Sequence, residues 1–272
     1  MKTALITGAT DGIGKATALK MLQENWNVVV LGRNLQKVQA TILELQTQTG
    51  KNTISGITAD LSVMEDVKKA VETFLHNNDR LDVLLLNANA IANERIITQE
   101  GNEQNFAVGY LSRVLMIQLL QDILNKTDNS QILSVMGRSW KRIDFDDLTI
   151  SNKFSGWKGL TRWQWSFALF LKNYATTNRI KCNIYSPGLV KTKILSNEPQ
   201  PMRTLVKIMN IIMGISTTKA AENINHVINE TNKFIVSGHF FEWKKDKGLI
   251  SIEYQKDDLK KLLELTSIIL KS

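Results

Sequence analysis

Residues 7–14 read Thr-Gly-Ala-Thr-Asp-Gly-Ile-Gly, and they join a short apolar run, Ala4–Ile6, to an amphipathic stretch that begins at Ile13. Glycines at this spacing let the backbone turn tightly, approach a pyrophosphate and bring the following helix close to its strand. The N-terminus of that helix then offers free amides and the positive end of a helix dipole to phosphate groups. The stretch therefore predicts a strand, a dinucleotide-binding turn and a helix at the start of the chain.

Outward from this turn, short apolar runs alternate with longer amphipathic stretches. The runs that predict strands are Ala4–Ile6, Val28–Leu31, Ile54–Thr58, Val83–Leu86, Ile132–Val135 and Ile180–Tyr185, with a seventh near Gly238–Trp243. The stretches that predict helices are Ile13–Gln23, Leu35–Gln48, Met64–Leu75, Gln104–Leu124 and Leu160–Tyr174. The strands are apolar on both faces, as in sheets that are covered by helices on both sides. We expect one α/β domain over residues 1–272, a doubly wound parallel sheet (Rossmann fold) of about seven strands flanked by helices.

The last third of the chain contains two further amphipathic segments. Apolar residues three and four positions apart predict a helix over Met202–Ile215. Residues 196–218 are a candidate lid over a ligand cleft, and a helix packed over the core is the alternative. A closing helix docked on the body of the protein is predicted by Leu259, Leu262, Leu263, Ile269 and Leu270.

The charge and the rare residue types exclude several function classes. The formal net charge is +8, but the basic residues are scattered along the chain, so nucleic-acid binding is not expected. Cys182 is the only cysteine, which rules out an internal disulfide, and the three histidines lie too far apart for metal-ligand spacing. No apolar run approaches the ~18 residues of a membrane span, so a cytoplasmic location is the expectation.

The end of the second predicted strand indicates which dinucleotide the chain prefers. In a domain of this type the residues after that strand meet the adenosine ribose, and here they are Arg33 and Asn34. An acidic residue at this place binds the 2′-hydroxyl of NAD, whereas an arginine pairs with the 2′-phosphate of NADP. The sequence therefore favours NADP(H) over NAD(H), and the alternative of a chain that binds no cofactor stays open.

These motifs resemble the short-chain dehydrogenase/reductase family, and in particular its retinol-dehydrogenase-like branch. The spacing Thr-Gly-x-x-x-Gly-x-Gly is that family's form of the turn, and the late segment Ser237–Phe241 is similar to a strand of the branch. Asn87-Ala88-Asn89 is similar to the family's Asn-Ala-Gly motif with the glycine changed. The cofactor-binding residues that the resemblance and the strand ends imply are Thr7, Gly8, Gly12, Ile13, Gly14, Arg33, Asn34, Asp60, Leu61, Asn87, Ala88, Asn89, Pro187, Gly188 and Thr192.

The resemblance implies hydride transfer between NAD(P) and an alcohol or carbonyl, with four side chains in defined roles. A tyrosine is the general acid/base, a lysine four residues later lowers its pKa, a serine holds the substrate oxygen and an asparagine orders a water. Such acid/base help is worth roughly 10²–10⁴ in rate. At these positions the sequence has Trp157 for tyrosine, Thr161 for lysine, Gly137 for serine and Gly109 for asparagine.

One check on this loss does not depend on the alignment. The chain has four tyrosines, Tyr110, Tyr174, Tyr185 and Tyr254. The residues four positions later are, in the same order, Val114, Asn178, Leu189 and Asp258. No Tyr-x-x-x-Lys therefore occurs in the chain. An indole has one N–H donor and no useful titration, and a threonine carries no charge. The tryptophans Trp157, Trp163 and Trp165 either pack in the core or on a helix, or form an aromatic wall that fills the former pocket or stacks on a flat ligand.

Three functional hypotheses follow. The first is an NADP(H)-binding protein without standard dehydrogenase activity, which acts on a small-molecule ligand or a protein partner. The second is an enzyme with altered chemistry on a lipophilic or aromatic molecule, either an NADPH-dependent reductase that uses Tyr110 or Ser139 or a non-redox catalyst that uses the aromatic cleft. The third is a structural subunit of a larger assembly. The resemblance also implies a homo-oligomer, by analogy with family enzymes.

Overall fold

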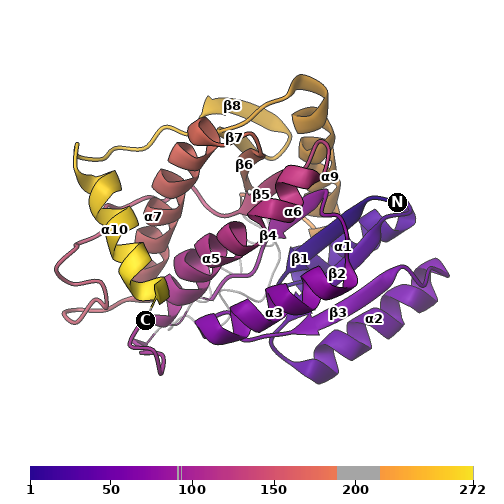
Figure 1. Cartoon of the computed structure of the whole chain (residues 1–272), viewed down its shortest axis with the longest axis horizontal. Helices are drawn as coiled ribbons and strands as arrows, with labels where there is room; N and C mark the ends of the chain where they lie inside the picture. Colours follow the sequence, from indigo (N-terminus) through magenta and orange to yellow (C-terminus); the bar gives the residue numbers. More distant parts are fainter. Residues whose placement is uncertain (91, 93, 189–214, 272) are drawn as a thin grey trace.

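The computed structural model describes residues 1–90, 92, 94–188 and 215–271 (Figure 1). Within them eight strands form one sheet in the order β3-β2-β1-β4-β5-β6-β7-β8. The strands are β1 Thr3–Thr7, β2 Asn27–Gly32, β3 Ile54–Thr58, β4 Val83–Leu86, β5 Gln131–Val135, β6 Lys181–Ser186, β7 His239–Glu242 and β8 Lys245–Leu249. The first seven run parallel, and β8 pairs antiparallel with β7. The predicted doubly wound α/β fold is confirmed.

The strand order reverses between β1 and β4, which lie side by side with Ile6 paired to Leu85. The loops that follow two such strands leave the sheet in opposite directions, so a crevice opens at their carboxyl ends. In this chain those loops are the glycine-rich turn after Thr7 and the segment that begins at Asn87. The topology thus places two of the predicted cofactor motifs at the same point of the sheet.

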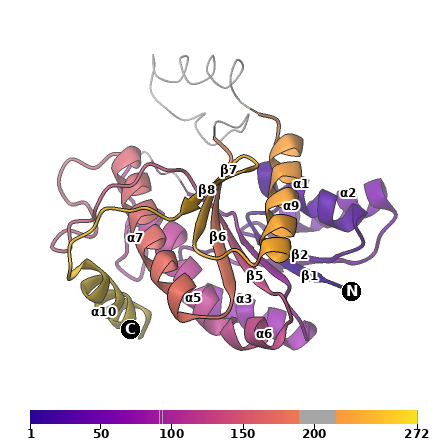
Figure 2. The ribbon, with the colours of Figure 1, turned by 90° about the horizontal axis from the view of Figure 1, so that it is seen from above.

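Helices cover both faces of the sheet (Figure 2). On one face lie α1 Gly12–Gln23, α2 Leu35–Thr49 and α9 Thr217–Phe234, and their apolar residues form one core with that side of the strands. On the other face lie α3 Met64–Asn77, α5 Ser112–Leu119 and α7 Gly156–Thr177, with α10 Asp258–Lys271 packed outside them. Buried apolar side chains on both faces of the central strands explain their almost uninterrupted hydrophobic sequences.

The long helix predicted over Gln104–Leu124 is divided into four elements. These are α4 Gln104–Phe106, the π-helical turn η1 Ala107–Leu111, α5, and α6 Gln121–Lys126. The buried Glu103 side chain caps the first of them by accepting hydrogen bonds from the backbone amides of Asn105 and Phe106. The π-helical turn contains Gly109, and such turns are frequent at functional sites.

Two elements were not expected from the sequence. Helix α9 begins after Ser216, whose hydroxyl accepts a hydrogen bond from the Lys219 amide. Strand β8 has the sequence Lys-Asp-Lys-Gly-Leu, which lacks the apolar pattern of the other strands because it is the mostly exposed edge of the sheet. The predicted closing helix is present as α10.

Part of the predicted lid region lies outside the described residues. This applies to Thr192 and to the helix expected over Met202–Ile215, except for Ile215 itself. The described end of the 196–218 region leads into α9. Within the described part of the chain, no helix has the length and apolar content needed to cross a membrane.

Candidate functional site

The glycine-rich turn is packed so closely that only glycine fits at two of its positions. Gly8 has a φ of +64°, and a Cβ on it would lie 2.8 Å from the Cα of Ala88. A Cβ on Gly14 would lie 2.4 Å from the carbonyl oxygen of Gly8. The turn therefore presents backbone, without side chains, to the crevice between β1 and β4, and this is the form of surface that a pyrophosphate can approach closely.

Asn87 ties the turn to the end of β4. Its side-chain amide donates to the carbonyl oxygens of Thr7 and Gly8, both at 3.1 Å. The Thr7 hydroxyl oxygen in turn accepts from the backbone amides of Asn87 at 2.9 Å and Ala88 at 3.0 Å. The structure thus brings together four of the predicted cofactor residues, Thr7, Gly8, Asn87 and Ala88, in one rigid unit.

The N-terminus of α1 faces this unit. Asp11 is the N-cap residue and accepts a hydrogen bond from the Gly12 amide at 2.7 Å. Helix geometry leaves the amides of Ile13 and Gly14 without acceptors inside the helix. These amides and the positive end of the helix dipole are available to an anion, as the sequence predicts.

The residues predicted for the adenosine end gather at the ends of β2 and β3. Arg33 is exposed, and its guanidinium lies 4.0 Å from a carboxylate oxygen of Asp60. Asp60 also accepts hydrogen bonds from the amide and hydroxyl of Ser62. Asn34 caps α2 by accepting from the Lys37 amide at 2.9 Å, and the neighbouring Leu61 is buried in the core. Arg33 is therefore an exposed cation at this end, at the limit of ion-pair distance from Asp60.

The predicted nicotinamide end is formed by Pro187-Gly188 after β6. Gly188 has a φ of +66°, and a Cβ on it would lie 2.7 Å from the indole nitrogen of Trp243. The same indole N–H donates to the Pro187 carbonyl oxygen at 3.0 Å. Trp243, which follows β7, thus holds this turn in place, a contact that the sequence alone did not indicate.

Gly137, the position predicted to correspond to the family's serine, faces a side-chain amide. A Cβ on Gly137 would lie 3.2 Å from the side chain of Gln164, a buried residue of α7. In the orientation that satisfies both of its polar atoms, Gln164 donates to the Ser139 carbonyl oxygen at 3.1 Å and accepts from the Gly137 amide at 3.2 Å. Sequence reasoning missed Gln164, because nothing in the local pattern shows which face of α7 meets the end of β5.

Tryptophan fills the space beside Gly109, the position predicted to correspond to the family's asparagine. A Cβ on Gly109 would lie 2.3 Å from the indole of Trp163, which is 1% exposed. Trp165 is also buried and donates to the Glu253 carbonyl oxygen at 2.9 Å. Two of the three clustered tryptophans therefore pack in the core, and the packing hypothesis is the one that fits them.

The remaining two tetrad positions lie on the first turns of α7. Trp157 is 63% exposed, so its indole is on the surface of the protein. Thr161 is buried, and its hydroxyl donates to the Lys158 carbonyl oxygen at 3.3 Å. Of the residues on α7, it is Gln164 that lies against Gly137.

The two residues considered as replacements have other contacts. The Tyr110 hydroxyl is fully buried and shares a hydrogen bond of 2.6 Å with Thr266 on α10, and burial raises its pKa. Ser139 is half-buried, and its carbonyl oxygen accepts from Gln164. A phenol with a raised pKa and a local partner is a poor proton donor for a ligand in the crevice.

The side chains of the other three tyrosines also have contacts elsewhere. Tyr185 donates to the Ala220 carbonyl oxygen at 3.4 Å on the α9 side of the sheet, and burial raises its pKa to about 12. Tyr174 is buried near the C-terminal end of α7, and burial raises its pKa to about 12. Tyr254 is exposed, with the ammonium of Lys172 5.4 Å from its ring centre.

Arg113 on α5 is a further polar residue of the site that sequence reasoning missed. It is 2% exposed and donates to the Ser134 hydroxyl at 2.5 Å, the Ala88 carbonyl oxygen at 2.8 Å and the Asn89 side-chain oxygen at 3.1 Å. Its guanidinium lies 4.7 Å from the Trp163 ring centre. Burial lowers its pKa to about 9, so it remains a cation at neutral pH. A charge inside an otherwise apolar helical stretch is the signal that could have revealed it.

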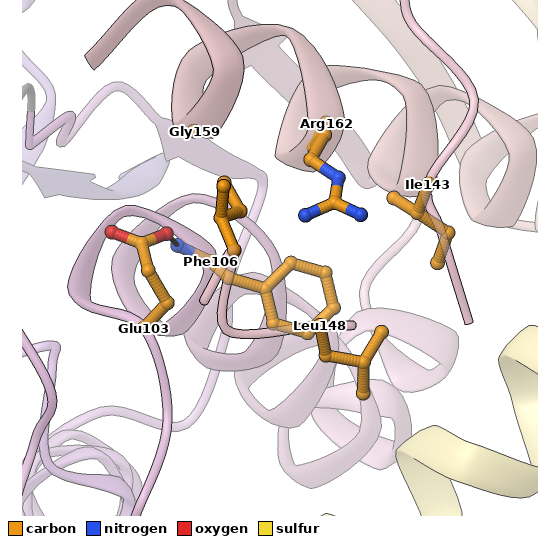
Figure 3. Close-up of a pocket in the computed structure, with 7 residues that line it drawn as sticks. Glu103, Phe106, Ile143, Leu148, Gly159 and Arg162 are labelled. Carbon is orange, nitrogen blue, oxygen red and sulfur yellow. Dashed lines mark hydrogen bonds between the residues drawn. The ribbon is translucent and has the colours of Figure 1, made fainter. Parts of the chain in front are cut away.

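A small cavity lies beside the N-terminal half of α7 (Figure 3). Glu103 and Arg162 approach it from different sides of Phe106. Burial raises the pKa of Glu103 and lowers that of Arg162. The cavity is too small for a water molecule, so it is a packing defect and not a ligand site. A larger groove of about 220 Å³ lies between α5, α7 and α10, away from the glycine-rich turn.

No metal centre is found where the structure describes the chain. Among those residues, no group of three His, Cys, Asp or Glu side chains lies close enough together to hold an ion.

Comparisons with other sequences agree with this geometry. A family model described as short chain dehydrogenase matches residues 2–139, about half of the 272 residues. Retinol dehydrogenase 13 of Homo sapiens is 27% identical over 258 residues, which cover 91% of this chain and 78% of the human protein. Polyprenol dehydrogenase of Homo sapiens is 22% identical over 266 residues, which cover 94% of this chain and 81% of that protein.

Solved structures show the same fold. An alcohol dehydrogenase from the archaeon Thermococcus sibiricus, complexed with 5-hydroxy-NADP, matches with a TM-score of 0.70 at 19% identity, over 93% of this chain and all of that one. An NADPH-dependent reductase involved in bacilysin biosynthesis matches with a TM-score of 0.73 at 17% identity, over 91% of this chain and 99% of that one. With the family model and the sheet topology in agreement, the chain belongs to the short chain dehydrogenase family and is retinol-dehydrogenase-like in sequence.

Proposed function

We propose that this protein binds NADP(H) in the crevice between β1 and β4 and does not carry out the family's tyrosine-dependent hydride transfer. One observation carries the proposal. The position of the family's serine, Gly137, faces the neutral amide of Gln164, while all four tyrosine side chains lie elsewhere.

The residues of the crevice fit a dinucleotide. Gly8 and Gly14 allow the turn, the end of β4 and the start of α1 to pack closely together, and the amides at the start of α1 suit a pyrophosphate. Arg33 suits the 2′-phosphate of NADP, because an exposed guanidinium forms strong charge-assisted hydrogen bonds to phosphate oxygens. When bound, NADP(H) would supply or accept the hydride, and the chain would have to supply or accept the proton.

The groups at the carboxyl end of β5 do not meet that second requirement. The Gln164 amide does not titrate, and both of its polar atoms are engaged by the backbone of Gly137 and Ser139. Arg113, the nearby cation, donates to four neutral acceptors and retains its proton at neutral pH. The cofactor is therefore held without the acid that the reaction needs.

Calorimetry on two arginine variants tests the binding part of the proposal. We expect Arg33→Gln to weaken the binding of NADPH about tenfold and to leave the affinity for NADH unchanged, since only NADPH carries the 2′-phosphate. Arg179→Gln is the matched control, because Arg179 is an exposed arginine that precedes the amino end of β6, whereas Arg33 follows the carboxyl end of β2. Equal affinities of the unchanged protein for NADPH and NADH would contradict the NADP preference.

The catalytic part is tested by following NADPH absorbance in the presence of a panel of aldehydes and ketones. We expect the protein to bind NADPH and to consume none above the rate without protein. Consumption that depends on Ser139, and disappears in Ser139→Ala, would instead support altered chemistry. A protein with no measurable affinity for either dinucleotide would contradict the proposal and favour a structural subunit.

A further inference from the structure

Arg113 is a buried cation with neutral surroundings. The groups that contact its guanidinium are the Ser134 hydroxyl and the Val135 carbonyl oxygen from β5, the Ala88 carbonyl and Asn89 amide oxygens after β4, and the rings of Trp163 and Phe167 from α7. No ion pair to Arg113 is found where the structure describes the chain. Burying a charge is unfavourable unless hydrogen bonds or an opposite charge offset the lost hydration.

The hydrogen bonds of Arg113 lead directly to the phosphate-binding turn. Its Nη2 donates to the Ala88 carbonyl, and the Cα of Ala88 lies against Gly8, so that one residue separates the guanidinium from the turn. A second connection runs through Asn89, whose side chain accepts from Arg113 and donates to the Asn87 carbonyl oxygen. Asn87 then donates to the Gly8 carbonyl oxygen. A charge here acts on an anion in the crevice through little more than one layer of backbone.

The family's own cation for the cofactor is absent, because the sequence contains no Tyr-x-x-x-Lys. Asn89 stands where the family has glycine, and it is Asn89 that provides one of the acceptors for Arg113. The unusual residue in the Asn-Ala-Asn segment and the unusual charge in α5 are thus in contact with each other. The hydrogen bond between Arg113 and Asn89 gives a physical reason for the presence of both residues.

We propose that Arg113 is a positioning residue for the dinucleotide. Its hydrogen bonds fix the Asn87-Ala88-Asn89 segment against the turn, and its charge stabilises the pyrophosphate electrostatically from inside the protein. The proposal rests on the proposed binding of NADP(H). Because the guanidinium is enclosed by protein, it acts without touching the cofactor, and its charge is little screened by salt.

Two substitutions separate the charge of Arg113 from its hydrogen bonds. Arg113→Lys keeps the charge and loses most of the network, whereas Arg113→Gln keeps hydrogen-bonding capacity and loses the charge. The control is Arg162→Gln. Arg162 is also partly buried and donates to backbone carbonyl oxygens, but it lines the small cavity beside α7. Affinity for NADPH is measured by calorimetry, and folding is checked by thermal unfolding.

We expect Arg113→Gln to weaken NADPH binding on the order of tenfold, as a unit charge in a low-dielectric interior should. The affinity of Arg113→Lys for NADPH should stay within about threefold of that of the unchanged protein. The affinity of Arg162→Gln should equal that of the unchanged protein. Undiminished binding by Arg113→Gln, or equal losses in the lysine and glutamine variants, would overturn the role of the charge.

The failure of this inference can be told apart from the failure of the proposed function. If the unchanged protein does not bind NADPH, both are overturned. If it binds and the Arg113 variants bind equally well, only the role of Arg113 is overturned. Should Arg113→Gln not fold, the folded lysine variant decides about the charge, because a tenfold loss in a variant that keeps the charge would contradict the electrostatic part of the proposal.

Discussion

Gly14 combines two constraints in one residue. It is the second residue after Gly12 in the first turn of α1, and its missing side chain leaves room for both Gly8 and the Asn87 side-chain amide. A methyl group would lie 2.4 Å from the Gly8 carbonyl oxygen and 2.6 Å from Asn87 Nδ2. The helix, the turn and the end of β4 therefore depend on the same glycine.

Gly14→Ala is expected to lower the free energy of unfolding by about 1–3 kcal/mol, because backbone must move to admit the methyl group. It should also abolish NADPH binding, since the displaced groups are those that line the crevice. Urea unfolding and calorimetry measure the two effects. Gly137→Ala is the control, because its new methyl would meet only the flexible Gln164 side chain at 3.2 Å. Similar losses in the two variants would show that the turn is not specially constrained.

For single residues, the sequence indicated those of the glycine-rich turn but not those that contact the ends of β4 and β5. Thr7, Gly8 and Asn87 belong to local motifs whose spacing is visible in one dimension. Gln164 and Arg113 become important only through contacts between α7, α5 and the ends of β4 and β5. Neighbours across elements leave no signature in local spacing, so no pattern could assign them.

Helix α10 is attached to the rest of the protein by a two-pronged ion pair. Arg142, in the segment after β5, donates from Nε and Nη2 to the two carboxylate oxygens of Asp258, at 2.7 and 2.6 Å. Asp258 is 1% exposed and is the first residue of α10. The hydrogen bond from Arg142 holds the pKa of Asp258 below its usual value despite partial burial.

Asp258→Asn is expected to lower the free energy of unfolding at neutral pH by about 2 kcal/mol, between the values for exposed and buried pairs. Because the folded-state pKa is lowered, this stabilisation is present at neutral pH and is lost as the pH falls below about 4. The difference between the two proteins in urea unfolding should therefore shrink in acid. Glu222→Gln, in an exposed pair with Lys219, is the control and should have a smaller effect. A difference that is constant with pH would contradict the assignment.

Elements were predicted where the apolar pattern is strong and missed where it is not. The strands β1 to β7 were located, and the apolar runs are densest in β1, β2 and β4. Strand β8 is charged and exposed, because an edge strand packs against only one neighbour. Helix α9 is the exception to this rule. Its buried residues Ala220, Ile224, Val227 and Ile228 follow a helical pattern that is visible in the sequence. The break at η1 depends on packing around Gly109 and Trp163, which no periodicity shows.

Cys182 reports on the stability of the whole molecule. It is the only cysteine, lies buried on β6 in the centre of the sheet, and burial raises its pKa to about 12. A thiol reagent should therefore not react with the native protein and should label it only after unfolding. Rapid labelling of the native protein would contradict the packing described here.

NADPH should slow this labelling in mild urea by a factor that grows with its concentration, because a ligand that binds only the folded state stabilises it. NADH should protect less at the same concentration, since it lacks the phosphate that Arg33 would meet. Protection factors that are equal for the two dinucleotides would speak against the NADP preference at the level of the whole protein.

The most direct test of the central claim is the transfer of deuterium from deuterated NADPH to an aldehyde, quantified by mass spectrometry under conditions where calorimetry shows the cofactor to be bound. We predict saturable NADPH binding and no deuterium in the alcohol product above the background without protein. Stoichiometric transfer at about one turnover per second or faster, an ordinary enzymatic rate, would contradict the account.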